Sequence, residues 1–118
     1  MNNVGLSGEN TAREFLISKG LSFVEGRFHT RWGEIDLIFR DKDCWVFVEV
    51  KTRQSLHNPA AVDAITPAKQ KRLINAALMF MKRRALEGQA MRFDVVLIEA
   101  GKIEWLRDAF QGSSWFTF

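Results

Sequence analysis

The chain has 118 residues, a length that predicts one compact domain spanning residues 1–118, because a core of this size is not readily divided. Hydrophobic residues make up 47% and charged residues 26% of the chain, a balance that excludes a disordered tail or a membrane span. The formal net charge of +3 favours a polyanionic partner but is too small to identify one.

The cysteine count and the first residues predict the cellular compartment. Cys44 is the only cysteine, which excludes an intrachain disulfide, a CxxC metal site and a redox pair, and a reducing cytoplasm is the simplest location. Residues 1–7 have neither the basic start nor the apolar stretch of a signal peptide, and no segment approaches the ~20 apolar residues that a bilayer requires. We therefore expect a cytoplasmic protein without a membrane segment.

The first half of the chain predicts a helix followed by three strands. Ser7 can cap the helix, and Gly20 stands where a left-handed residue would end it. The strands are expected at residues 21–28, 34–39 and 45–51. The last two strands are rich in β-branched and aromatic residues and are separated by a short polar break, so they form a predicted β-hairpin.

The second half predicts a loop, a long helix and two more strands. Residues 52–65 are polar and contain the breaker Asn58-Pro59, which indicates an irregular loop. Thr66 followed by Pro67 predicts the N-terminus of a helix that continues to about Glu87 and is ended by Gly88. Strands are expected at residues 93–98 and 103–106, and the aromatic tail 110–118 can dock on the core or on a partner. The predicted order is αβββαββ.

The predicted hairpin brings acidic residues together. If it closes symmetrically about residues 42–43, residues whose numbers sum to 85 lie opposite each other, so Asp36 faces Glu49 and Glu34 faces Lys51. Alternation then gives a polar face and an apolar face: Glu34, Asp36, Glu49, Lys51 and Arg53 on the first, and Ile35, Leu37, Phe39, Val46, Val48 and Val50 on the second. Toward the turn the polar face becomes apolar, and a helix can cover that half.

Opposed carboxylates need a compensating cation. At ~4 Å two carboxylates repel each other by about 4 kcal/mol at an effective dielectric of about 20, more than the ~1 kcal/mol that an exposed lysine contact returns. Mg²⁺, with Mn²⁺ as a substitute, prefers such oxygens and takes its remaining ligands from water and phosphate. The alternative is a salt-bridged strand pair in which Lys51 and Arg53 neutralise the acids.

Two helical residues can reach the acidic end of the hairpin. Glu9 borders the apolar stripe of the first helix, which suits a further acidic ligand, although a first-turn acid is also favoured by the helix dipole. Lys69 lies on the stripe of the second helix, one turn before the apolar residues begin, and can either reach the acids or extend to water. Lys71 belongs to an outer basic strip that can contact phosphates or remain simply solvated.

Other kinds of site find little support in the sequence. His29 and His57 are isolated, have no spaced cysteine or histidine partner, and are expected in loops, so they do not form a zinc signature. The chain has no Gly-rich phosphate loop and no Gly-x-Ser-x-Gly motif, which disfavours NTP hydrolysis and serine esterase chemistry. The acidic end of the hairpin is therefore the main candidate site.

Several groups of residues spread over most of the chain also form a family pattern. They are the sequences GEIDLI at 33–38 and VFVEVKTR at 46–53, Gly8-Glu9 with Ala12, Lys69 with Leu73 and Ala77, RFDVV at 92–96, and EWLRDAF at 104–110. With this pattern the chain resembles the YraN-type family of bacterial proteins, which is endonuclease-like but uncharacterised. That family is similar to the PD-(D/E)xK nucleases, which include the archaeal Holliday junction resolvases.

The resemblance implies an α/β fold with a restriction endonuclease-like αβββαβ core, in which helices flank a mixed sheet. It also implies a Mg²⁺-dependent phosphodiesterase site, with Asp36, Glu49 and Glu9 as metal ligands. Lys51 would orient water or stabilise the charge that develops on phosphorus. The expected nucleic-acid contacts are Arg53, Lys69, Arg31 and Lys71.

The predicted function is therefore a Mg²⁺-dependent endonuclease that acts on DNA, either branched or single-stranded. A homodimer is expected by analogy with the resolvases. The alternative is a module on the same fold that binds nucleic acid or a protein partner without chemistry, because membership of a fold does not establish that a substrate is cut.

Overall fold

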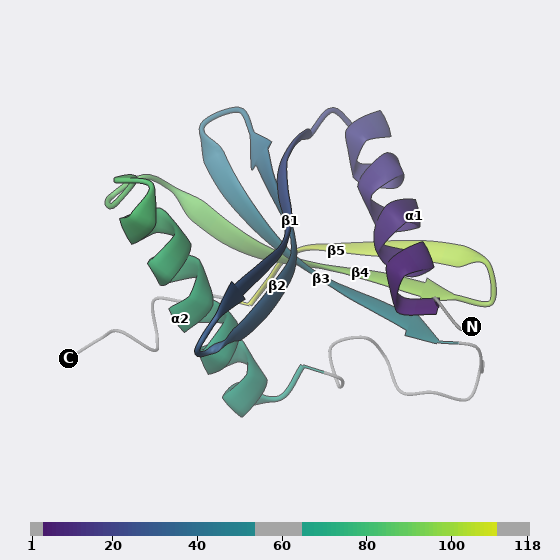
Figure 1. Cartoon of the computed structure of the whole chain (residues 1–118). Helices are drawn as coiled ribbons and strands as arrows, with labels where there is room; N and C mark the ends of the chain where they lie inside the picture. Colours follow the sequence, from purple (N-terminus) through teal and green to yellow (C-terminus); the bar gives the residue numbers. More distant parts are fainter. Residues whose placement is uncertain (1–3, 54–64, 111–118) are drawn as a thin grey trace.

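The computed structural model describes residues 4–53 and 65–110, which form a mixed five-stranded sheet with one helix on each face (Figure 1). The elements are α1 (Val4–Ser18), β1 (Ser22–Thr30), β2 (Gly33–Asp41), β3 (Cys44–Arg53), α2 (Pro67–Arg83), β4 (Met91–Glu99) and β5 (Lys102–Phe110). The strands lie in the order β1-β2-β3-β4-β5, and only β3 and β4 run parallel. This arrangement confirms the predicted element order and the restriction endonuclease-like α/β class.

The central strand β3 is buried on both faces. Trp45 and Phe47 pack against α2 around Phe80, whereas Val46 and Val48 lie in the cluster that α1 covers with Leu16. Because alternate residues of a strand point to opposite faces, α1 and α2 lie on opposite sides of the sheet. A strand covered in this way reads as a continuous apolar run, which is why residues 45–48 carry no charge.

Helix α1 begins earlier than predicted and ends where predicted. It starts at Val4, so Ser7 lies inside the helix and the predicted N-cap is wrong; residues 4–6 contain no proline that would stop the helix from extending. Gly20 has a φ of 98°, and the Leu21 N–H donates to the Leu16 carbonyl at 3.1 Å. This pattern is a Schellman motif, and the predicted glycine stop is confirmed.

Helix α2 has the predicted start but a different end. Thr66 Oγ1 accepts from the Lys69 N–H at 3.2 Å, which confirms the N-cap. The helix ends at Arg83 instead of Glu87, because Ala85 adopts a left-handed φ of 55° and the Leu86 N–H donates to the Met81 carbonyl at 2.8 Å. Leu86 then packs against the core cluster under α2, and this burial stops the helix before Gly88.

The β2–β3 hairpin keeps the predicted register and then opens. Opposed residues sum to 85 from Asp41 and Cys44 at the turn to Leu37 and Val48, where the pairing ends. Beyond that point β2 continues to pair with β1, while β3 stays paired with β4 as far as Arg53. The strands β2 and β3 therefore separate (Figure 1), and the predicted pairs at and beyond Asp36 are absent from the described register.

The opening of the hairpin overturns one predicted face. Ile35 packs with Ile38 and Phe28 in the cluster under α2, although simple alternation placed it on the opposite face from Ile38. The regular alternation is interrupted because β2 leaves β3 after Leu37 and because its other neighbour, β1, carries a left-handed residue at Arg27 (φ 53°).

Other differences concern segment ends. His29 lies in β1 and not in a loop, and Thr52 and Arg53 belong to β3 and not to the predicted loop. The remainder of that loop, with His57 and Asn58-Pro59, and the aromatic tail from residue 111 onward lie outside the described residues. No helix in the described ranges combines the length and the apolar character needed to cross a bilayer.

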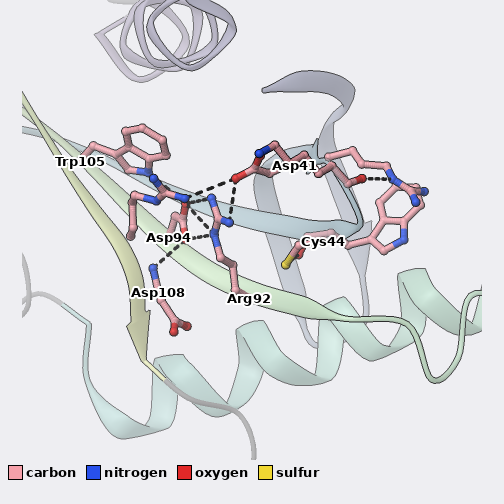
Figure 2. A network of polar contacts seen from close by, with 10 residues as sticks. Asp41, Cys44, Arg92, Asp94, Trp105 and Asp108 are labelled. Carbon is pink, nitrogen blue, oxygen red and sulfur yellow. Dashed lines mark hydrogen bonds and ion pairs between the residues drawn. The ribbon is translucent and has the colours of Figure 1, made fainter. Parts of the chain in front are cut away.

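A buried polar network holds the edge strand β5 near the hairpin turn (Figure 2). Asp94 is 1% exposed and accepts hydrogen bonds from Arg92, from the Trp105 indole at 2.9 Å and from the Asp108 N–H at 2.8 Å. Arg92 also donates to Asp41 at 2.9 Å. Both carboxylate oxygens of Asp94 are engaged, so the acid of the RFDVV sequence is a structural group that fixes β5 on β4.

Candidate active site

The candidate site lies where β2 and β3 separate. Asp36 is the first residue of β2 beyond the shared register, and its Oδ2 accepts the Val50 N–H at 2.8 Å. One carboxylate oxygen thus replaces a backbone acceptor that the departing strand no longer offers. The site is reached by side chains from both helices, because the opening lies between α1 on one face of the sheet and α2 on the other.

Three carboxylates gather at this opening. Glu9 of α1 and Glu34 and Asp36 of β2 each offer an oxygen, and these atoms lie within 4.8 Å of one another. Glu9 was predicted as a ligand from helix periodicity, and the structure brings it to Asp36. Glu34 was placed on the polar face by alternation but was not chosen as a ligand, because the assumed register directed it toward Lys51.

Glu9 is held in place by close packing and by an ion pair. The neighbouring Gly8 lies so close to Thr52 of β3 that a Cβ at this position would meet the Thr52 hydroxyl. Glu9 Oε1 also accepts from Arg27 Nε at 3.0 Å. The absence of a side chain at Gly8 therefore lets the first half of α1 approach β3 and bring Glu9 to the opening.

A lysine pair flanks the three acids on the α2 side. Glu49 is 7% exposed, and its Oε2 contacts Lys69 Nζ at 2.8 Å and Lys51 Nζ at 3.5 Å. The predicted convergence of Glu49, Lys51 and Lys69 is therefore found in the structure. The same oxygen serves both ammonium groups, and neither of these contacts engages the other oxygen of Glu49.

The acids and lysines shift one another's ionisation. Burial, then the charge of Glu49, raises the pKa of Asp36 to about 7, although the Val50 hydrogen bond opposes the rise. Burial and the neighbouring Lys69 lower the pKa of Lys51, and Glu49 offsets this only in part. Burial is the largest influence on Lys69 and acts to lower its pKa, but the contacts with Glu49 and Lys51 and the charges of Glu49 and Asp36 together outweigh it, so the pKa is raised. The acidic centre therefore lies beside two different lysines. The charged form of Lys69 is favoured, and the charged form of Lys51 is disfavoured.

Comparison with known proteins places the chain in a family. A model of the uncharacterised protein family UPF0102 matches residues 8–98, a stretch that contains all the acids and lysines of the site. The chain belongs to the UPF0102 family. The resemblance to the YraN-type family is thereby confirmed. Because the family is described as uncharacterised, membership does not fix a reaction.

Curated relatives of this UPF0102 chain cover nearly all of it. A UPF0102 protein of Burkholderia ambifaria is 46% identical over 110 residues, which are 92% of this chain and 77% of the relative. A UPF0102 protein of Herminiimonas arsenicoxydans is 43% identical over 108 residues, covering 92% of this chain and 86% of the relative. One from Alkalilimnicola ehrlichii is 46% identical over 107 residues, with coverages of 90% and 85%.

The carboxylates of the UPF0102 chain fit a small hard cation. Mg²⁺ binds oxygens at about 2.1 Å, so neighbouring ligand oxygens are about 3 Å apart and opposite ones about 4 Å apart. The spacing within 4.8 Å reaches this geometry with small side-chain movements. The raised pKa of Asp36 is in line with this fit, because burial and then the charge of Glu49 disfavour its ionised form, which a bound cation would favour.

The remaining predicted contacts of the UPF0102 chain lie around the site and not within it. Arg31 is exposed in the β1–β2 turn, and Lys71 is exposed on the outer side of α2. Arg53 is half-buried at the end of β3, and its Nε has no hydrogen-bond partner among the described residues. Of the predicted nucleic-acid contacts, only Lys69 has a described bond to a site carboxylate.

Proposed function

We propose that this UPF0102 chain is a Mg²⁺-dependent phosphodiester hydrolase that cuts nucleic acid, with DNA as the expected substrate. The observation that carries the proposal is the convergence of Glu9, Glu34 and Asp36 within 4.8 Å, beside the ammonium groups on Glu49. Three acids at one point are poorly placed for stability, because like charges this close repel each other. A divalent cation held by the three acids would offset that repulsion and would supply a positive charge for the phosphate of a substrate.

Each site residue has a distinct role in this proposal. Glu9, Glu34 and Asp36 would hold Mg²⁺, which would supply Lewis-acid chemistry for the phosphate and for a water molecule. Lys51 lies beside the acids and stabilises the additional negative charge of the phosphate during attack. Lys69 orients Glu49 through its 2.8 Å contact, and the other oxygen of Glu49 is able to join the metal ligands as the sequence pattern suggested.

The surrounding cations favour a polyanion over a small neutral substrate. Arg31, Lys71 and Arg72 are exposed near the site or on the outer side of α2, and none of them has an ion-pair partner among the described residues. Unpaired cations of this kind exchange counterions for backbone phosphates, so binding should weaken as salt rises. Nucleic acid is the substrate class that matches both this surface and the phosphate chemistry of the centre.

Cleavage assays test the proposal directly. The purified chain is incubated with supercoiled plasmid and with branched and single-stranded DNA, in Mg²⁺, in Mn²⁺ and in EDTA. We expect nicking that requires the cation and that is lost in Asp36→Asn, because the variant keeps the shape of the side chain but not its charge. Cation-dependent nicking that persists in the variant at the wild-type rate would reject this site as the source of activity.

The ligand set is tested separately through metal binding. We expect Glu34→Gln to weaken Mn²⁺ binding at pH 8 on the order of tenfold or more, because one of three close carboxylates is neutralised. Glu49→Gln should weaken binding less, since this side chain is already neutralised by lysines. Calorimetric titration of both variants gives the two affinities. A larger loss in Glu49→Gln than in Glu34→Gln would restore the ligand set predicted from the sequence.

A binding module without chemistry is the second candidate. It is favoured by one observation, the engagement of Glu49 Oε2 by two ammonium groups, which resembles a purely structural salt bridge. This function predicts salt-sensitive DNA binding that is equal in Mg²⁺ and in EDTA, without cleavage. The same assays therefore separate the two candidates.

A further inference from the structure

The turn between β1 and β2 presents an exposed tryptophan on a rigid support. Trp32 is 37% exposed, whereas the comparable Trp45 in the core is 7% exposed. Thr30 Oγ1 accepts the Trp32 N–H at 3.0 Å and donates to the Gly33 carbonyl at 3.0 Å. The Thr30 hydroxyl therefore fixes the backbone on both sides of Trp32, at the end of the hairpin.

Trp32 borders a hollow that joins the candidate active site. The hollow is lined by Trp32, Gly33, Glu34, Lys69, Arg72 and Leu73, which places the β1–β2 turn beside the first turns of α2 (Figure 1). Glu34 and Lys69 belong to the candidate site itself. The hollow therefore connects two residues of the candidate site with the indole ring.

The surroundings of Trp32 suit a flat aromatic ligand that carries a phosphate. The Arg31 guanidinium lies 4.8 Å from the ring centroid and covers one face, while Trp32 and Leu73 contribute apolar groups to the lining of the hollow. Arg72 is exposed at the rim of the hollow and has no ion-pair partner among the described residues. An aromatic platform flanked by cations is the arrangement with which proteins hold unpaired bases along a nucleic-acid strand.

The other described tryptophans are engaged within the fold, which sets Trp32 apart. The Trp45 indole donates to Gln89 at 2.9 Å, and the Trp105 indole donates to buried Asp94 at 2.9 Å. For Trp32 no indole hydrogen bond is found among the described residues, and its side chain is absent from the core clusters. Structural packing therefore does not account for a tryptophan at this position.

We infer that Trp32 stacks on an unpaired nucleobase of the strand held at the carboxylates, so that the site prefers single-stranded or branched nucleic acid to continuous duplex. The inference rests on the proposed function for the position of the strand. In a continuous duplex both faces of each base are covered by its neighbours, so only an unpaired base offers a free face to the ring. Arg72 would hold the adjacent phosphate.

The inference is tested by DNA binding in EDTA, where no cleavage can occur. The probes are a single-stranded DNA, the same strand in full duplex, and the single strand with one abasic nucleotide at successive positions. We expect Trp32→Ala to weaken single-strand binding about tenfold and duplex binding hardly at all. Trp32→Phe, which keeps a stacking face, should stay within about threefold of wild type. Thermal melting of both variants checks that they fold.

Tryptophan fluorescence adds a readout that a structural role would not change. Binding of the single strand should quench wild-type emission, and the quenching assigned to Trp32 should be missing in Trp32→Phe although binding persists. The penalty of Trp32→Ala should also vanish when the abasic nucleotide occupies the stacking position, because the base that the ring would contact is absent.

The outcomes separate this inference from the proposed function. Equal single-strand affinity of wild type and Trp32→Ala overturns the inference, even if Mg²⁺-dependent cleavage is observed. Equal loss of single-strand and duplex binding in Trp32→Ala overturns it too, because the ring would then act on the duplex backbone. Loss confined to unpaired DNA, in a protein that never cleaves, supports the inference while the proposed nuclease function fails.

Discussion

Replacing Asp36 with asparagine is expected to remove metal binding and cleavage while making the metal-free protein more stable at pH 8. The folded protein raises the pKa of this carboxyl from 3.8 to about 7, chiefly by burial and by the charge of Glu49. A carboxyl that is ionised at pH 8 in these surroundings opposes folding. Asparagine removes the charge and keeps an oxygen that can accept the Val50 N–H.

The sign of the pH dependence follows from the raised pKa. In the folded state the Asp36 carboxyl binds its proton more tightly than in the unfolded chain, so its stabilising contribution is complete below pH 3.8 and is lost as the pH rises through about 7. Three pKa units at about 1.4 kcal/mol each give an upper bound of about 4 kcal/mol. We expect the variant to gain on the order of 2 kcal/mol at pH 8 and clearly less at pH 5.

Denaturant unfolding in EDTA at pH 5 and pH 8 measures this difference. A parallel series in Mg²⁺ gives the control, because a cation that binds only the folded state stabilises wild type and leaves Asp36→Asn unchanged. The order of stability should therefore reverse when enough Mg²⁺ is added. A variant that is less stable than wild type in EDTA at pH 8 would mean that the negative charge itself supports the fold.

The sequence predicted the positions of these residues well where local geometry decides them. The symmetric hairpin gave the correct register near the turn, and helix periodicity directed Glu9 and Lys69 to the acidic end. Both inferences use contacts that are close in sequence or fixed by a regular helix. For the same reason the caps at Thr66 and Gly20 were predicted correctly.

The features that the sequence did not predict depend on contacts between distant segments of the chain. The sequence of β2 and β3 does not show that β3 stays with β4 while β2 stays with β1, and this separation places Glu34 with Asp36 instead of opposite Lys51. The early end of α2 likewise comes from the burial of Leu86 in the core. Tertiary contacts outweigh local signals in both cases.

The largest loss of stability is expected from Asp94→Ala. The carboxylate of Asp94 is buried, and it pairs with Arg92 at 3.1 Å while accepting the Trp105 indole and the Asp108 N–H (Figure 2). Alanine leaves a mostly buried guanidinium and two further donors without this acceptor. Removing one partner of a buried ion pair costs about 3–5 kcal/mol, and we expect a loss in that range.

A matched control separates the effect of burial on stability from the effect of an ion pair itself. Glu25 pairs with Arg84 at 2.7 Å, but both side chains are much more exposed than Asp94. Glu25→Ala should therefore cost less than about 1 kcal/mol, because solvent screens an exposed pair. Denaturant unfolding of the two variants under identical conditions gives the comparison. Similar losses in both would show that burial does not strengthen the Asp94 network.

Asp94→Ala should also loosen β5 selectively. The pairing of β4 and β5 shifts register between Phe93 and Val95, where Asp108 adopts a left-handed φ of 51°. The Asp94 carboxylate binds the N–H of that irregular residue, so its loss should raise amide exchange across residues 102–110 before it affects β2.

The Asp94 network, which includes Asp41, lies far from the candidate site. Asp41 and Asp36 are five residues apart on β2, about 16 Å along the strand, so the Asp94→Ala molecules that stay folded should keep their Mg²⁺ affinity. A variant that lost Mg²⁺ binding while fully folded would show that the two ends of the sheet are coupled.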